Sequence, residues 1–123
     1  MNTKNTGDFG EDAVCEYLIN SGYEITERNY HTPYGEIDII AEKNNSIAFI
    51  EVKTRRNNRY GNASEYVDKR KQKKIILSAF VYLGENTERE MSFDVAEVYY
   101  GKKEDKPYVK KINYIENAFI MEE

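Results

Sequence analysis

The order of its expected elements predicts that this chain adopts an α/β fold with a mixed sheet. Two stretches, near residues 9–20 and just before Gly84, repeat apolar residues at the three- and four-residue spacing of a helix with one packed face. Three strand-like stretches lie between the two helices, and two more follow the second helix. The order αβββαββ departs from regular βαβ alternation, so we expect a layered α/β sandwich whose sheet mixes parallel and antiparallel strands.

The composition is typical of one globular domain covering residues 1–123. Hydrophobic residues make up 40% and charged residues 33% of the chain, an ordinary balance for a polar surface around one core. The longest apolar run, Ile75 to Leu83, is far shorter than the ~18 residues of a membrane span, and the first residues show no apolar signal-peptide region. One cysteine, Cys15, and one histidine, His31, predict neither an internal disulfide nor a structural zinc site. We therefore expect a cytoplasmic protein without a membrane segment.

The first helix is expected from about Phe9 to Asn20, capped by Thr6 or Asp8 and ended by Gly22. An apolar stripe marks its packed face: Val14, Cys15 and Leu18. Stepping back three or four residues from this stripe leads to Glu11, so a carboxylate lies on the inward face of the first turn.

A strand near Tyr23–Tyr30 precedes a hairpin whose register follows from its turn. The sequence KNNS is a turn signal, and Asn44 and Asn45 tolerate positive φ. Loops of two or four residues give the same five pairs: Glu36–Lys53, Ile37–Val52, Asp38–Glu51, Ile39–Ile50 and Ile40–Phe49. One face of the hairpin then carries four ionisable side chains above Ile40 and Phe49. The other face is apolar and must be covered by a core element.

The second helix is expected to begin near Asn62 or Ser64, where Asn62 and Glu65 resemble a capping box, and to end at Gly84. Its inward stripe is apolar: Ile75, Ile76, Ala79, Phe80 and Leu83. Gln72 precedes the stripe by three or four residues, which puts a polar amide on the packed face.

Two further strands, near Met91–Tyr100 and Lys106–Ile115, are expected to form a second hairpin across the turn-forming sequence GKKEDKP. The last residues, ENAFIMEE, are expected to form a short helix. These elements complete the order stated above.

Charge is distributed unevenly along the chain. The segment Lys53–Lys74 holds nine basic and two acidic residues, a net charge of +7, which leaves −11 on the rest of a chain whose total is −4. Its candidate phosphate contacts are Arg55, Arg56, Arg59, Lys69, Arg70, Lys71, Lys73 and Lys74. Two tyrosines in the same segment, Tyr60 and Tyr66, are candidates for base stacking. A basic patch on an acidic body can bind phosphates locally, because screening acts beyond ~10 Å. A simple solvated surface is the alternative.

The hairpin face supplies a constellation with definite chemistry. Asp38 opposite Glu51 brings two carboxylates to roughly 5 Å at their Cβ atoms, and a like-charge pair is destabilising there. Either one carboxyl group takes up a proton or a divalent cation binds between them. Mg²⁺, or Mn²⁺ in its place, suits two carboxylates and a backbone carbonyl such as that of Val52. Lys53 can contact the attacking water and the charge building on phosphorus, and Glu11 can serve as a further ligand or orient the water. This set is a metal-assisted phosphodiester hydrolase in outline.

The triplet Glu51-Val-Lys53 has little specificity by itself. The same spacing recurs at Glu104-Asp-Lys106, in a turn that suggests no function. A surface lattice of ion pairs, with Glu36 against Lys53, is the alternative reading of the hairpin face. That lattice does not account for two carboxylates placed opposite each other on an apolar strand.

At these positions the sequence resembles the PD-(D/E)xK nucleases, the restriction-endonuclease-like superfamily that includes archaeal Holliday-junction resolvases. It is more closely similar to the YraN-type family of small, uncharacterised bacterial proteins. The resemblance covers nearly the whole chain through the stretches GEDAVCEYL, GEIDIIAE, FIEVKTR, VDKRKQKKI and FDV. In fold, it implies a three-layer core with a mixed central sheet flanked by helices.

In function, the resemblance implies a metal-dependent endonuclease, acting on DNA and in some relatives on branched DNA such as Holliday junctions, where such proteins work as homodimers. The implied site is a catalytic core of Asp38, Glu51 and Lys53, a supporting carboxylate, Glu11, and an active-site amide, Gln72. The superfamily's proline–aspartate is replaced here by Glu36-Ile-Asp38. Glu36 is therefore a metal ligand, a partner for Lys53, or neither.

Three functions of different classes follow from these patterns. The first is the metal-dependent nuclease. The second is a nucleic-acid-binding module that keeps the nuclease fold without cleaving, and the third is a structural or adaptor domain. Steep loss of binding with salt separates the first two from the third.

Overall fold

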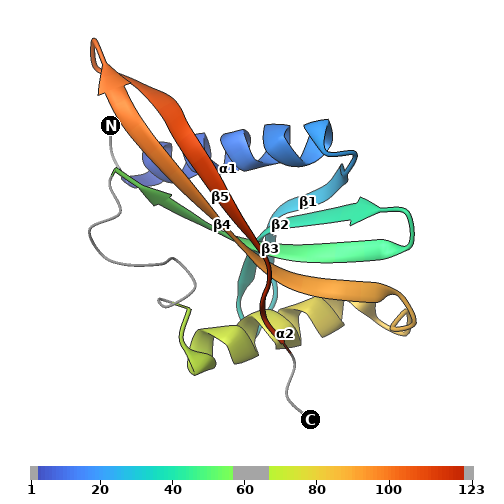
Figure 1. Ribbon diagram of the computed structural model, residues 1–123. Helices are drawn as coiled ribbons and strands as arrows, with labels where there is room; N and C mark the ends of the chain where they lie inside the picture. Colours follow the sequence, from blue (N-terminus) through green and yellow to red (C-terminus); the bar gives the residue numbers. More distant parts are fainter. Residues whose placement is uncertain (1–2, 57–66, 121–123) are drawn as a thin grey trace.

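The computed structural model describes residues 3–56 and 67–120 and shows the expected order αβββαββ (Figure 1). The elements are α1 (Thr3–Asn20), β1 (Glu24–His31), β2 (Glu36–Lys43), β3 (Ser46–Arg55), α2 (Lys69–Leu83), β4 (Glu90–Lys103) and β5 (Lys106–Phe119). Within these residues the strands form a five-stranded sheet in the order β1-β2-β3-β4-β5. β3 and β4 pair in parallel and the other neighbours antiparallel, so the predicted mixed sheet is confirmed.

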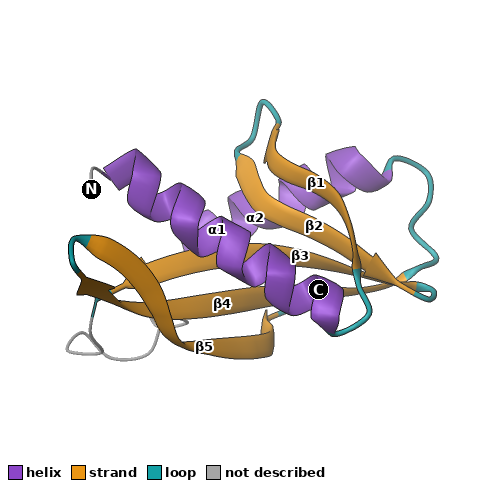
Figure 2. Cartoon of the chain, turned by 90° about the horizontal axis from the view of Figure 1, so that it is seen from above, coloured by secondary structure: helices purple, strands orange, loops and turns teal. Residues whose placement is uncertain are grey.

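The sheet is the middle of three layers, with α1 on one face and α2 on the other (Figures 1 and 2). The core under α1 contains the predicted stripe and its sheet partners: Val14, Cys15, Leu18, Ile39, Ile50, Ala96 and Val98. The core under α2 contains the second predicted stripe and its partners: Ile40, Phe49, Ile75, Ala79, Leu83, Phe93 and Val95. Both faces of the β2–β3 hairpin are therefore covered, not only the purely apolar one.

The first helix begins earlier than the sequence predicts, at Thr3 rather than Phe9. Phe9 packs edge-to-face on Tyr100 of β4, at 6.0 Å between ring centroids, and such packing outweighs the weak cap signal of nearby polar residues. The end of the helix is as predicted. Gly22 has φ of 94°, its N–H donates to Ile19, and the N–H of Tyr23 donates to Leu18 at 2.9 Å, which closes the helix in a Schellman motif.

The β2–β3 hairpin has the predicted register over its first half. Five pairs, from Lys43–Ser46 to Ile39–Ile50, run back from a two-residue turn in which Asn44 has φ of 55°. The predicted pairs beyond Ile39 are wrong, because β2 turns away from β3 there (Figure 2) and the ladder does not contain Asp38–Glu51, Ile37–Val52 or Glu36–Lys53. Ile37, expected on the face of Ile39, packs instead in the core under α2.

The second helix begins at Lys69, later than the expected start near Asn62 or Ser64, which lies outside the described residues. Asp68 is its N-cap, and its carboxylate accepts a hydrogen bond from the backbone N–H of Lys71 at 2.8 Å. The predicted end is confirmed, because Gly84 is the C-cap and its N–H donates to Phe80.

The second hairpin, β4–β5, is longer than predicted, and residues 116–119 of the expected terminal helix belong to β5 instead, while residues 121–123 lie outside the described residues. Asn117 takes φ of 55° and donates its N–H to the Asp94 carboxylate at 3.0 Å. Phe119 then stacks on Phe93 at 5.4 Å between ring centroids. These contacts with β4 override the helical tendency of the terminal sequence.

Candidate functional site

The predicted site lies in a fork where β2 leaves β3. At the mouth of the fork the backbone N–H of Val52 donates to the Asp38 carboxylate at 2.8 Å. A cavity of about 260 Å³ opens beside it, lined by Gly35, Glu36, Asp38, Glu51, Lys71, Lys74 and Ile75. Asp38 and Glu51 thus face one cavity from two diverging strands.

The two carboxyl groups are in contact within this fork. Glu51 is 7% exposed. Burial raises the pKa of Asp38 to about 7, and the Glu51 charge and a direct hydrogen bond with Glu51 add to the shift. The electrostatic cost expected of two facing carboxylates is therefore present in the folded protein.

Two ammonium groups compensate Glu51. Lys71 of α2 donates to Glu51 Oε1 at 2.5 Å, and Lys53 Nζ lies 3.6 Å from the same oxygen. Burial, followed by the neighbouring Lys71 charge, lowers the pKa of Lys53. Burial would also lower the pKa of Lys71, but the hydrogen bond and charge of Glu51 outweigh it and raise that pKa. Lys71 therefore keeps its positive charge to higher pH than Lys53 does.

Glu11 lies on the other side of the sheet, on α1, as its helical spacing predicts. Its carboxylate accepts from Asn29 Nδ2 at 3.0 Å and lies 3.5 Å from an Arg28 guanidinium nitrogen. Burial raises the pKa of Glu11, and the Glu11 charge contributes to the raised pKa of Asp38.

Two of the implied site residues have other partners. Gln72 Nε2 donates to the Val67 carbonyl at 2.8 Å, so its amide ties the start of α2 to the preceding chain. Glu36 is exposed and faces His31 across the β1–β2 ladder, with 3.6 Å between carboxylate oxygen and Nδ1. Glu36 still lines the cavity.

The basic segment divides into an inner and an outer set. Arg55 is 17% exposed at its side chain, and its Nε lies 3.6 Å from a buried carboxylate oxygen of Glu97. Asn113 Nδ2 also donates to Glu97, at 3.1 Å, so this part of the segment is built into the sheet. The exposed basic residues are Arg56, Lys69, Arg70, Lys73 and Lys74. The remaining candidates, Arg59, Tyr60 and Tyr66, lie outside the described residues.

A family model for "Uncharacterised protein family UPF0102" matches residues 10–98, which hold the second part of α1, all of α2, the carboxylate pair and both lysines at Glu51. The chain belongs to this family. A UPF0102 protein of Alkaliphilus metalliredigens is 44% identical over 119 residues, covering 95% of this chain and 99% of the relative. One of Clostridioides difficile is 44% identical over 121 residues, covering 97% and 100%. One of Fusobacterium nucleatum is 51% identical over 83 residues, covering 68% and 70%.

In this UPF0102 chain, Lys71 lies in the site beside Glu51, whereas the sequence predicts it as a phosphate contact on the basic surface. Helical spacing could have found it, because Lys71 precedes the buried Ile75 by four residues and so shares its face. Through residues 3–56 and 67–120, no three His, Cys, Asp or Glu side chains gather as a metal-binding group. The donors that the fork does offer are the Asp38–Glu51 pair and nearby backbone carbonyls.

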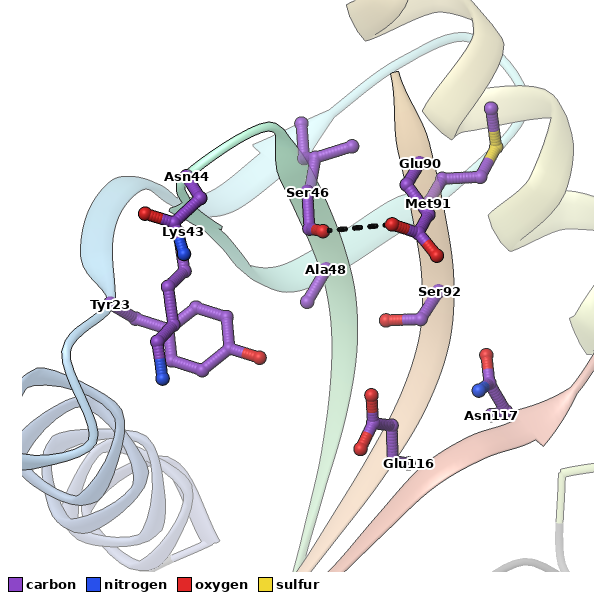
Figure 3. A pocket seen from close by; sticks show the side chains of 11 residues that line it. Tyr23, Lys43, Asn44, Ser46, Ala48, Glu90, Met91, Ser92, Glu116 and Asn117 are labelled. Carbon is purple, nitrogen blue, oxygen red and sulfur yellow. Dashed lines mark hydrogen bonds between the residues drawn. The ribbon is translucent and has the colours of Figure 1, made fainter. Parts of the chain in front are cut away.

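A larger cavity of about 380 Å³ lies at the other end of the hairpin, near its turn (Figure 3). It contains no predicted site residue. Lys43 donates to the Ser21 carbonyl at 2.8 Å and lies over the Tyr23 ring, and Ser46 Oγ donates to Glu90 at 3.4 Å. These polar side chains serve to join elements, so size alone does not locate the functional site. In the part of the chain that the structure describes, neither helix has the length and apolar character for crossing a membrane.

Proposed function

We propose that this UPF0102 protein is a metal-dependent endonuclease that hydrolyses phosphodiester bonds in DNA. The observation that carries the proposal is that the Asp38 and Glu51 carboxyl groups line one cavity in the fork, with Lys53 Nζ 3.6 Å from Glu51 Oε1. A buried carboxylate beside a half-buried one whose pKa is raised is costly for the fold, and such arrangements cluster at functional sites.

The donor set suits a hard divalent cation. Asp38, Glu51 and the Val52 carbonyl would hold Mg²⁺ or Mn²⁺, with Glu11 or Glu36 as further oxygen donors. When bound, the ion would supply Lewis acidity and a water of lowered pKa. Lys53 would donate hydrogen bonds to the phosphate oxygens as negative charge grows on them. Lys71 donates to Glu51 in the structure, so a metal ion bound at that carboxylate would compete with its ammonium group.

The exposed basic residues on α2 and at the end of β3 support a nucleic-acid substrate. We include branched DNA such as Holliday junctions in the proposal, with a homodimer placing one site on each of two strands. Since the proposed substrate is DNA, we propose that the protein acts in the cytoplasm.

A specific observation favours a second function, a nucleic-acid-binding module that does not cleave. Lys53 and Lys71 together neutralise Glu51 without any metal, so the site is stable as an ion-pair cluster. In that case the basic surface would act alone.

Cleavage of supercoiled plasmid, linear duplex and a four-way junction in Mg²⁺ or Mn²⁺ tests these proposals. We expect the wild type to cleave and Glu51→Gln to lose cleavage while keeping DNA binding. Glu90→Gln, a matched change at the other end of the hairpin, should cleave as the wild type does. Salt-dependent binding without cleavage would favour the binding module, and absence of both would favour the adaptor. Sedimentation on the junction measures whether two copies bind.

A further inference from the structure

The β4–β5 hairpin extends past the rest of the sheet. The β3–β4 ladder ends at the pair Arg55–Tyr99, whereas β4 continues to Lys103, and its partner there among residues 3–56 and 67–120 is β5. The hairpin turns through Glu104 and Asp105, which both have positive φ, 54° and 64°. In Figures 1 and 2 its tip lies toward the same side of the molecule as the end of β3 and the start of α2.

This arm is basic. Five lysines and two acidic residues between residues 102 and 111 give a net charge of +3 on a chain of −4. The lysines are Lys102, Lys103, Lys106, Lys110 and Lys111, and all but Lys102 are exposed. Within the described residues, none of the five forms an ion pair with a carboxylate.

The arrangement of the lysines is costly for an isolated hairpin. Lys103 and Lys106 are direct cross-strand partners, and like charges in that position destabilise the pair. Tyr108 is 46% exposed beside them. An anionic partner would remove the repulsion, and lysine ammonium groups on a projecting ribbon suit the phosphates of a nucleic-acid backbone.

The arm also has a suitable reach from the site. Glu51 is level with Val95 on β4, and Lys103 lies eight residues further on, about 26 Å at 3.3 Å per residue. A duplex spans that distance in about eight base pairs at 3.4 Å each. One DNA backbone can therefore pass from the fork to the tip of the arm.

We propose that the β4–β5 hairpin is a second DNA-contacting element, which grips the duplex backbone about eight base pairs from the site. This inference rests on the proposed function, since it takes DNA as the substrate. The inference adds a minimum length of DNA for full binding. A duplex shorter than about eight base pairs would contact the fork and α2 but not the arm.

Anisotropy titrations in EDTA, which prevents cleavage, test the arm on a labelled 20-base-pair duplex and a six-base-pair stem-loop. The variant is Lys103→Gln/Lys106→Gln. Its control is Lys43→Glu, which changes the net charge equally at the other end of the sheet, and circular dichroism checks both folds. We expect the double variant to bind the long duplex about 3–10-fold more weakly, with a salt slope smaller by about 1–2. The stem-loop should bind both variants alike.

The outcomes separate the arm from the function. Wild-type binding with an unchanged long-duplex affinity in the double variant would overturn the arm and leave the proposed function standing. An equal loss of affinity for the stem-loop in the double variant, or for the long duplex in Lys43→Glu, would also overturn the proposed role of the arm. The loss would then be explained by the change in net charge alone. If the wild type shows no salt-dependent binding, both proposals fail, and the lysines then protect an edge strand from pairing.

Discussion

The two ends of the β2–β3 hairpin are made from the same two strands and differ in how their charges are satisfied. At the turn, the ladder is complete, Lys43 bonds a backbone carbonyl, and Glu42 pairs with Arg89. In the fork, the ladder has ended, and two carboxyl groups line one cavity.

The comparison shows which end of the hairpin contains unfavourable interactions between charges. Charges at the turn end are joined to opposite charges or dipoles and stabilise the structure. In the fork, the Asp38 and Glu51 carboxylates repel each other, and the ammonium groups of Lys53 and Lys71 offset the charge of Glu51. A fold that retains such a pair in one place, while avoiding it a few residues away, points to the fork as the site of function.

The largest expected difference between the two ends is catalytic. Lys53→Met should reduce DNA cleavage in Mg²⁺ by about 10²–10³-fold, because the ammonium that would contact the phosphate is lost. Lys43→Met, the same change at the turn end, should cleave as the wild type does. Equal rates for both variants in initial-rate assays would remove the distinction between the ends.

The next difference is in stability and its dependence on pH. Folded protein holds the Asp38 proton up to about pH 7, whereas the unfolded chain releases it near 3.8. The folded state binds more protons in that window, so the free energy of unfolding falls as pH rises through it and levels off above. Asp38→Asn should lack this fall and be more stable than wild type at pH 8 by about 1–3 kcal/mol.

Urea denaturation in EDTA between pH 5 and 8 measures the effect. Glu90→Gln is the control at the turn end, where the exposed carboxylate accepts a hydrogen bond from the Ser46 hydroxyl. The interpretation fails if the wild type and Asp38→Asn show parallel pH profiles.

A smaller effect concerns the cation already at Glu51. Lys71→Met should tighten Mg²⁺ binding by about 3–10-fold, because an ammonium group no longer competes for the Glu51 carboxylate. Lys73→Met, an exposed neighbour on α2, should leave the affinity unchanged. Amide resonances of residues 36–53 report the titration. Weaker binding in Lys71→Met would mean that Lys71 supports the metal site instead.

The smallest effect belongs to the turn. Asn44 has φ of 55°, which a β-carbon makes unfavourable and asparagine tolerates. Asn44→Ala should lower the free energy of unfolding by about 1 kcal/mol, and Asn44→Gly should change it by less than about 0.5 kcal/mol. Neither should alter Mg²⁺ binding. Chemical denaturation of the two variants measures the stabilities, and a larger loss for glycine would contradict the turn geometry.

Much of the fold and part of the site could be predicted because the signals are local. The turn at Asn44 sets the hairpin register, and the apolar stripes place Glu11 inward and Ile75 in the core. Asp38 and Glu51 were predicted to face each other, and their carboxyl groups do meet. They are not paired residues of the β2–β3 ladder, however, because they face each other across the fork where that ladder has ended.

The sequence by itself determined the element order, the hairpin register near its turn and the carboxylate pair, since each follows from spacing along a few residues. Only the tertiary structure decided that β2 leaves β3 after Ile39, that Lys71 rather than Gln72 reaches Glu51, and that Arg55 is taken by Glu97. These outcomes depend on how distant elements pack against the sheet. Periodicity shows which face a side chain occupies, but the partner on that face comes from another part of the chain.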